Sequence, residues 1–315
     1  MSQQNTNTIM MVRPVQFRFN EQTAVNNYYQ KVIEGLSADQ IQTQAQQEFD
    51  GFVEKLEKSG VNVIVIDDTI SPDTPDSIFP NNWVSFHGDG RVGLYPMCAI
   101  NRRLERRMEI FDILKNEHHL EISAIEDFTH HENEDLFLEG TGSMILDRVH
   151  MIAYAAISVR TNLEIFEEFC DKFDFQAVTF VANQTVDGKR LPIYHTNVMM
   201  CVADQFAVVC LDTIDDVNER SNLIEVLEDS DREIIEISED QVNQFAGNML
   251  QVVSDIGQKY LVMSSSAYNS LDSDQINTIE NYCPIIHSSL DTIEALGGGS
   301  ARCMMAEVFL PKKAL

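Results

Sequence analysis

A hairpin pattern that recurs along the whole chain most constrains this fold. Four segments each hold two apolar, β-like stretches joined by a short polar turn, which predicts an antiparallel β-hairpin. Their starts lie roughly 50 to 60 residues apart, a spacing close to that of repeated supersecondary units. The four segments are WVSFHGDGRVGLY from Trp83, SMILDRVHMIAYA from Ser143, VMMCVADQFAVVCL from Val198 and MLQVVSDIGQKYLVMS from Met249.

Helix-like stretches and two unpaired strands complete the repeat. The last strand, Cys303–Leu310, has no following partner, and the first, Thr8–Pro14, has no preceding one. Pairing them would close a ring of five units. We therefore predict a single closed α/β domain over residues 1–315, with five-fold pseudosymmetry and ββαβ-type units. The predicted helices are Ala38–Lys58 (followed by the strand VNVIVID), Asn101–Lys115, Thr161–Lys172, Val217–Leu227 and Ser273–Asn281.

Composition bounds the class of protein and its partners. The chain has 315 residues, of which 44% are hydrophobic, so it can bury a substantial core. Its formal charge of −28 repels nucleic acid and anionic membranes, and neither is expected as a partner. The N-terminal segment lacks the pattern of a signal peptide, which predicts a cytoplasmic protein. In that compartment the six cysteines are expected as thiols, and none has the CxxC spacing of a metal site.

One cysteine differs from the others in its local sequence. Cys303 follows GGGSAR, and the glycines let the backbone approach a ligand and bring a thiol to the rim of the ring through a flexible loop. The other five cysteines lie in apolar stretches of the sequence, where cysteine behaves as a small hydrophobic residue. A reactive thiolate needs a partner that lowers its pKa, most often a histidine that also transfers protons.

His195 is the best candidate for that partner among eight histidines. It precedes an apolar strand in LPIYHTNVMM, at the edge of a predicted hairpin, where loops of a rigid scaffold converge. Glu139 has the corresponding place in DLFLEGTGSMILD and could orient the histidine or hold a substrate nitrogen. Asp76 and the pair Asn81–Asn82 lie at the equivalent edge of the first hairpin. Each of these acids and amides could equally be an ordinary polar turn residue.

Taken in order, these motifs resemble the guanidino-group modifying enzymes. The motifs are PDSIF with Asn81–Asn82, FLEGTG, SVRTN, YHTN and the C-terminal glycine loop with its cysteine. This superfamily contains arginine deiminase, dimethylarginine dimethylaminohydrolase and the amidinotransferases. The resemblance spans nearly the whole chain and implies the closed five-bladed α/β propeller, or pentein, that the hairpin spacing suggests.

The resemblance also implies roles for individual residues. Cys303 matches the nucleophile, His195 the general acid/base and Glu139 the carboxylate that works with it. Asp76 matches the residue that holds the substrate α-amino group. Arg160, in SVRTN, matches the arginine that grips the α-carboxylate, and Arg102, in NRR, looks like a second such arginine, a task that suits the guanidinium fork.

Two departures from the pattern bear on the substrate. Deiminases place carboxylates where this chain has Asn82 and Asn197, and those acids embrace a guanidinium cation. A buried guanidinium without its anions would be destabilised by several kcal/mol. A neutral ureido group fits better, because its oxygen needs a donor and its NH2 an acceptor, and asparagine supplies both. The motif set looks most like the citrulline-utilisation hydrolases of the superfamily.

The predicted reaction is hydrolysis of citrulline to ornithine, carbon dioxide and ammonia through a covalent intermediate on Cys303. Asn82 and Asn197 would stabilise the oxyanion, and no metal or organic cofactor is implied. The partner is a small amino acid, citrulline or an arginine derivative, and a homodimer is compatible with the apolar hairpins.

Other functions stay open at this point. The nearest is a deiminase or dimethylarginine hydrolase in which another acid, Glu134, Asp135 or Glu307, reaches the site. An amidinotransferase would share the nucleophile and differ in what resolves the intermediate. A non-catalytic binding ring is the alternative of a different class, and the set of Cys303, His195 and Glu139 argues against it.

Overall fold

Five three-stranded sheets with one shared topology form the protein. The computed structural model describes residues 3–313 of the chain. In each sheet the first two strands pair antiparallel and the third joins the second in parallel. The sheets are β17 (Ala306–Glu307), β1 (Thr8–Arg13) and β2 (Asn62–Asp67); β3 (Val84–Phe86), β4 (Arg91–Leu94) and β5 (Ala124–Asp127); β6 (Ile145–Asp147), β7 (Ile152–Ala156) and β8 (Gln176–Phe180); β11 (Met200–Val202), β12 (Phe206–Val209) and β13 (Glu233–Glu236); and β14 (Leu250–Val253), β15 (Lys259–Ser264) and β16 (Ile285–Ser288).

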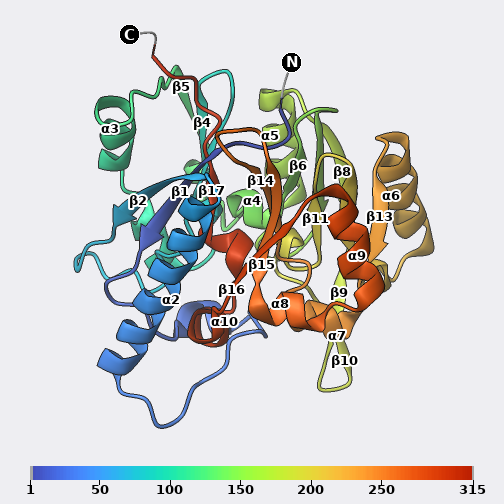
Figure 1. Ribbon diagram of the computed structural model, residues 1–315, viewed down its shortest axis with the longest axis horizontal. Coiled ribbons are helices and arrows are strands. Elements are labelled where there is room, and N and C mark those ends of the chain that lie inside the picture. The colour runs from blue at the N-terminus through green and yellow to red at the C-terminus, as the bar shows by residue number, and fades with distance from the viewer. Residues whose placement is uncertain (1–2, 314–315) are drawn as a thin grey trace.

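A helix connects the second and third strand of every sheet, as a parallel pair requires. These helices lie on the outside of the molecule (Figure 1). The longest, α2, begins with a capping box at Ser37 and buries Phe49, Phe52 and Leu56, each worth about 1.5–3 kcal/mol. The connecting helices are α2 (Ala38–Lys58), α3 (Glu109–Asn116), α5 (Leu163–Phe173), α6 (Val217–Asp229) and α9 (Ser273–Tyr282).

All four predicted hairpins and the pairing of the two ends of the chain are confirmed. β1 pairs antiparallel with β17 through Ile9 and Glu307, so one sheet is completed by both termini, which leave at the same edge (Figure 1). Strand pairing does not continue from one sheet to the next within residues 3–313, so the α/β class with repeated units is confirmed and the closed ring is not. No helix in those residues is both long and apolar enough to cross a bilayer.

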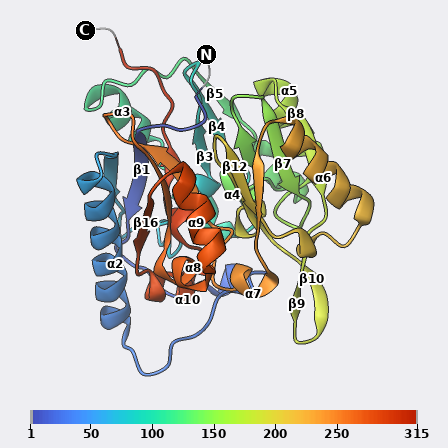
Figure 2. The same cartoon turned by 45° about the vertical axis from the view of Figure 1, so that its right-hand side comes forward.

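Two predicted elements differ from the structure. The helix expected over residues 101–115 is a 3₁₀ turn, Ile100–Glu105, followed after a break by α3, because Arg102 turns inward to bind Glu105. The strand expected from Cys303 is also shorter, since Cys303 lies on a 3₁₀ turn whose backbone bonds back to Ser300. A hairpin that the sequence did not reveal, β9 (Asn183–Val186) with β10 (Lys189–Pro192), projects from the body of the molecule (Figure 2).

Short helical turns precede the first strands of the hairpins and position the candidate site. α4 packs against the 3₁₀ turns at Pro80–Asn82 and Thr196–Val198, and the first of these also packs against the turn that carries Cys303. We call this side of the sheets the strand-start edge, and the side with the hairpin turns the turn edge. The remaining short helices are α1 (Glu21–Ala24), α4 (Gly140–Ser143), α7 (Glu239–Val242), α8 (Ser265–Ser270) and α10 (Asp291–Gly297).

Candidate active site

The strand-start edge gathers the predicted site residues from positions far apart in the sequence. Asn82, His195 and Cys303 line one small pocket together with Arg102 and Arg160. Glu139 lies directly behind His195 and is fully buried. The space left in the pocket is about 10 Å³, roughly that of one water molecule, so an amino acid can occupy it only when lining side chains move.

Cys303 is held by two amide groups. Its Sγ accepts hydrogen bonds from Nδ2 of Asn197 at 3.4 Å and of Asn248 at 3.2 Å, and the side chain is 3% exposed. The two amides thus fix the position of the sulfur and point N–H groups at it. The GGGS segment is buried rather than flexible: Gly298 has φ +62°, and a Cβ at Gly297 would lie 2.7 Å from the ring of Phe79. The glycines are thus needed for close packing and a left-handed backbone.

His195 and Glu139 form a buried pair. Nε2 of His195 donates to Oε2 of Glu139 at 2.7 Å, which leaves Nδ1 as the basic nitrogen of the neutral ring. Burial lowers the pKa of His195 to about 4, although Glu139 acts in the opposite direction. Burial also opposes ionisation of Glu139, but the Arg160 charge and the His195 hydrogen bond outweigh it and hold its pKa below the usual range. The pair is therefore a neutral imidazole on a carboxylate.

Gly142 lets this pair approach the first hairpin. A Cβ built on Gly142 would lie 2.3 Å from Nδ2 of Asn82 and 2.8 Å from Nδ1 of His195. Contacts that short do not occur, so any larger residue would push one of the two side chains away. The second glycine of the EGTG motif therefore brings an amide donor and an imidazole base onto the same wall.

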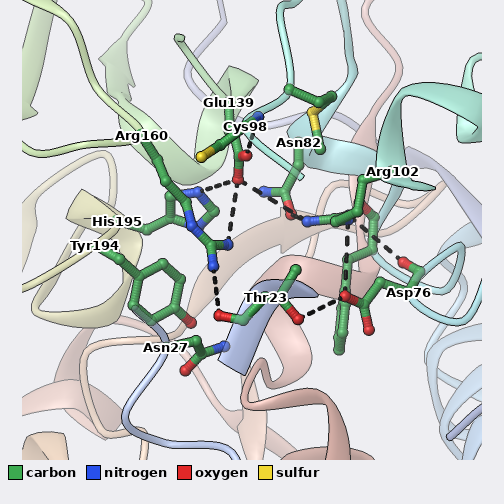
Figure 3. A network of polar contacts seen from close by, with 12 residues as sticks. Thr23, Asn27, Asp76, Asn82, Cys98, Arg102, Glu139, Arg160, Tyr194 and His195 are labelled. Atoms are coloured by element: carbon green, nitrogen blue, oxygen red, sulfur yellow. Dashed lines mark hydrogen bonds and ion pairs between the residues drawn. The ribbon is translucent and has the colours of Figure 1, made fainter. Parts of the chain in front are cut away.

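Asn82 has a fixed orientation. Its Oδ1 accepts from Nη1 of Arg102 at 2.8 Å, and because arginine is only a donor, the amide cannot be turned around. Its Nδ2 then has no hydrogen-bond partner among residues 3–313. Arg102 is in turn held by Glu105, with Nε and Nη2 each 2.9 Å from a carboxylate oxygen; Figure 3 shows Arg102 beside Asn82. The resemblance predicted that the Arg102 guanidinium binds a substrate carboxylate. In the structure Glu105 already occupies this guanidinium, and Arg102 fixes Asn82 instead.

Asn197 presents the complementary group. Its Nδ2 points to Sγ of Cys303, so its buried Oδ1 remains without a partner in the described chain. Asn82, which lines the pocket, therefore has an unused donor, and Asn197, behind Cys303, has an unused acceptor.

Arg160 and Asp76 are both buried and contact the segment around α1. Nη2 of Arg160 donates to the carbonyl oxygen of Thr23 at 2.9 Å, Nε donates to Asn26, and the guanidinium lies over the ring of Tyr194 (Figure 3). Oδ2 of Asp76 accepts from Asn20 and Thr23, whereas its Oδ1 is buried without a partner among the described residues. Burial raises the pKa of Asp76, and Arg102 partly offsets this.

Several residues of the site were not found from the sequence. Asn248, in FAGNML, gave one possible signal, because it precedes a first strand as Asn82 and Asn197 do. Glu105 gave none beyond its i, i+3 spacing from Arg102. The rival acids Glu134, Asp135 and Glu307 do not line the pocket, and Glu307 pairs with Arg302.

Comparison of the sequence with protein families decides the family. The family described as N,N dimethylarginine dimethylhydrolase, eukaryotic, matches residues 13–310. The chain belongs to this family. The family lies within the guanidino-group modifying superfamily, so the resemblance stated from the motifs is confirmed, and the chain is an enzyme of this superfamily. No curated protein sequence matches it.

Solved structures with the same fold are distant in sequence. ArgZ, an arginine dihydrolase from the ornithine-ammonia cycle in cyanobacteria, has a TM-score of 0.73 and 17% identity over 97% of this chain and 41% of its own. AgrE with ornithine and NAD+ has a TM-score of 0.72 and 18% identity over 98% of this chain and 40% of its own. The adduct of a dimethylarginine dimethylaminohydrolase variant with S-methyl-L-thiocitrulline has a TM-score of 0.63 and 12% identity, over 96% of this chain and 99% of its own. This family member thus spans about two fifths of ArgZ and AgrE.

Proposed function

We propose that the protein hydrolyses citrulline to ornithine, carbon dioxide and ammonia, with Cys303 as nucleophile, His195 as general acid and base, and Glu139 as the carboxylate that orients His195. The orientation of Asn82 carries this proposal. Because Arg102 occupies its oxygen, Asn82 can only donate into the pocket. A ureido group presents an oxygen to such a donor, whereas a guanidinium presents only N–H groups, which would oppose it.

Asn197 supports the same substrate. Its free Oδ1 can accept from the ureido NH2, while its Nδ2 stays on the sulfur of Cys303. The pocket therefore matches a neutral group that has one acceptor and one donor side. In this arrangement Asn82 supplies the amide donor for the oxyanion, and Asn197 positions the ureido NH2 and the thiolate.

The amino-acid end of the substrate is assigned to Arg160 and Asp76. Nε and Nη2 of Arg160 are bound by neutral acceptors, the Asn26 side chain and the Thr23 carbonyl, which a substrate carboxylate can replace, while Nη1 stays on Glu139 at 3.4 Å. Asp76 has an unused carboxylate oxygen for the α-ammonium group.

The reaction then follows in balanced steps. The proton of Cys303 passes to Nδ1 of His195, and the thiolate attacks the ureido carbon. The bond from that carbon to the δ-nitrogen breaks as His195 returns the proton, which releases ornithine and leaves a thiocarbamate on Cys303. Water, deprotonated by His195, cleaves this ester to carbamic acid, which falls apart into carbon dioxide and ammonia.

The second candidate is hydrolysis of arginine or a methylated arginine. The names of the family and of its structural neighbours favour it, and the ionised Glu139 lies close enough to the pocket to attract a cation. An amidinotransferase differs only in the acceptor that resolves the intermediate, and the pocket gives no reason to prefer it.

Product identification separates these functions. The purified protein is incubated with citrulline, arginine or dimethylarginine, beside a Cys303→Ser control, and products are identified by mass spectrometry. Ornithine from citrulline alone is expected. Citrulline formed from arginine or dimethylarginine would overturn the proposed substrate while leaving the nucleophile intact.

The double variant Asn82→Asp with Asn197→Asp tests the charge argument. It restores two anions in the pocket, so the ratio of arginine to citrulline turnover is expected to rise. Asn218→Asp, on the exposed face of α6, is the matched control for added charge. An unchanged ratio in the double variant would show that the amides do not decide the substrate.

Three further proposals concern the whole chain. The shared topology of the five sheets, with β17 completing the first, supports a closed propeller that forms one catalytic domain over residues 1–315. All six cysteines are free thiols, which supports a cytoplasmic location. The homodimer stays a prediction.

A further inference from the structure

A second cavity lies at the turn edge, away from the candidate active site. Its volume is about 570 Å³, within the range of small-molecule sites. The turns of the β3–β4 and β6–β7 hairpins, the end of α5 and Phe309 form its walls. Asn82 and Glu139 precede the same two hairpins at the opposite edge. The cavity and the active site therefore lie at opposite ends of these hairpins, and no residue lines both.

Arg148, in the β6–β7 turn, is the unusual residue of this cavity. It is 6% exposed, yet its guanidinium donates no hydrogen bond to any of residues 3–313. The nearest carboxylate oxygen, on Glu307, is 4.0 Å away and is already bound by Arg302 at 2.9 Å. Burial lowers the pKa of Arg148, and Glu307 only partly offsets this. The buried Nε therefore lacks an acceptor, which is destabilising unless a ligand supplies one.

The surrounding walls are flat and largely apolar. The guanidinium of Arg148 lies 4.1 Å above the ring of Phe309. Across the cavity, Phe173 stacks on His87 with 4.1 Å between ring centres and carries Arg91 on its ring at 4.5 Å. Such walls accept a planar or aliphatic group, and stacking leaves the edge of the Arg148 fork free for hydrogen bonds.

The charges in the cavity favour an anion. Asp89 is neutralised by Arg91, with Nε of Arg91 2.6 Å from its carboxylate. Asp174, at the end of α5, is exposed and therefore well screened. Arg148 is the one buried charge of the lining without a close partner among the described residues.

We propose that this cavity binds a small molecule in which an oxyanion, either a carboxylate or a phosphate monoester, is carried on a flat apolar body. The oxyanion accepts hydrogen bonds from Arg148, and the body packs against the aromatic residues of the lining. The proposal is independent of the reaction at Cys303 and does not rest on it.

Isothermal titration calorimetry with the full chain, in buffer without phosphate, tests the proposal. Phenylacetate and phenyl phosphate are the two oxyanion probes, and phenylacetamide is the neutral match of the first. At least one oxyanion is expected to bind at one site per chain, with phenylacetamide at least tenfold weaker. The stronger probe identifies the kind of oxyanion.

Two variants locate the binding. Arg148→Met keeps the packing on Phe309 and removes the fork, and at least a tenfold loss of affinity is expected. Arg107→Met, which removes a guanidinium bound to the carbonyl of Asp67, is the matched control and should retain full affinity. A thermal melt of Arg148→Met shows whether it is folded; if it is not, Arg148→Lys, which keeps the charge without the fork, replaces it.

Four outcomes would overturn the proposal. The first three are no binding of either oxyanion, equal binding of phenylacetamide, and unchanged affinity in a folded Arg148 variant. A probe that citrulline displaces and that Arg160→Met abolishes binds at the active site, which also contradicts the assignment.

Discussion

Two buried arginines, Arg102 and Arg148, lie at opposite edges of the hairpins and have opposite environments. Arg102 places two nitrogens on Glu105 and a third on Asn82, so its charge is matched and its position is fixed. Arg148 is buried to a similar degree, but no described residue accepts a hydrogen bond from its guanidinium. A matched charge serves as a rigid support for neighbouring groups, whereas an unmatched one is suited to receive a ligand.

We therefore assign the catalytic reaction to the strand-start edge, where Arg102 lies. We assign ligand binding without catalysis to the turn edge, where Arg148 lies. At the first edge each catalytic candidate is held by another side chain: Glu139 on His195, Asn248 on Cys303, Arg102 on Asn82. Such mutual support keeps reacting groups in place, which catalysis requires. The following experiments would break or sharpen the distinction, beginning with the largest effect.

Replacing the nucleophile should have the greatest effect. Cys303→Ser is expected to lower turnover by roughly 10⁴-fold or more, because a serine hydroxyl is not ionised in this pocket. Steady-state assays of ornithine release measure it. Cys98→Ser is the control: its thiol is half-exposed near Glu139, but burial and Glu139 raise its pKa, so its removal should leave most turnover. The opposite ranking of the two variants would move the nucleophile to Cys98.

The two arginines should differ in their contribution to stability. Arg102→Met leaves Glu105 as an unpaired buried carboxylate and is expected to lower the free energy of unfolding by about 3–5 kcal/mol. Arg148→Met removes a charge without close partners, while Glu307 keeps Arg302, so stability should stay within about 1 kcal/mol or rise. Urea denaturation measures both. Equal losses would mean that Arg148 is as well matched as Arg102.

Asn248 should act on the reactivity of the thiol. Asn248→Ala removes one of the two donors to Sγ, a hydrogen bond to a charged group worth about 1.5–3 kcal/mol, so alkylation of Cys303 by iodoacetamide should slow by roughly tenfold to a hundredfold. The rate is followed against pH, because a purely structural residue would not shift the profile. Asn218→Ala, on an exposed helix face, should leave the rate unchanged.

The smallest effect is a pH dependence of stability due to His195. Its pKa in the folded protein is about 4, below the 6.5 of a free imidazole, so the unfolded chain binds more protons between these values. The contribution of His195 is therefore fully present above about pH 6.5 and is lost as the pH falls toward about 4. Urea denaturation of the native protein and of His195→Gln at several pH values measures it. A difference between the two that grows on acidification would contradict the buried neutral imidazole.

Local sequence patterns were sufficient to predict the repeated hairpins and the longest helix. The alternating apolar stretches around the turns at Gly88–Gly90 and Asp204–Gln205 predict hairpins because strand periodicity and turn chemistry act within a few residues. The predicted α2 matches the structure at both bounds, since its cap and amphipathic pattern are local as well. The hairpin β9–β10 was missed because it is short, polar and built on exposed contacts.

The residue types of the site were also accessible, through motifs that resemble a known superfamily. Asn82, His195 and Cys303 line one pocket, Glu139 is hydrogen-bonded to His195, and Asn197 is hydrogen-bonded to Cys303. Asn248 was not found, because its contact with Cys303 forms only when two separate turns pack together. Glu105 was not found, because its i, i+3 spacing from Arg102 in one turn does not reveal that the turn is buried.

What the sequence determined by itself is which elements form, which family the motifs match and which side chains carry reactive groups. Only the tertiary structure decided which of those groups are already paired. The hydrogen bond from Arg102 to Asn82 depends on the packing of segments 20 residues apart. The missing hydrogen bond at Nε of Arg148 likewise depends on which residues the fold places around it. Periodicity is a property of neighbours along the chain, whereas pairing is a property of neighbours in space, and so the direction of each amide and the state of each buried charge had to come from the fold.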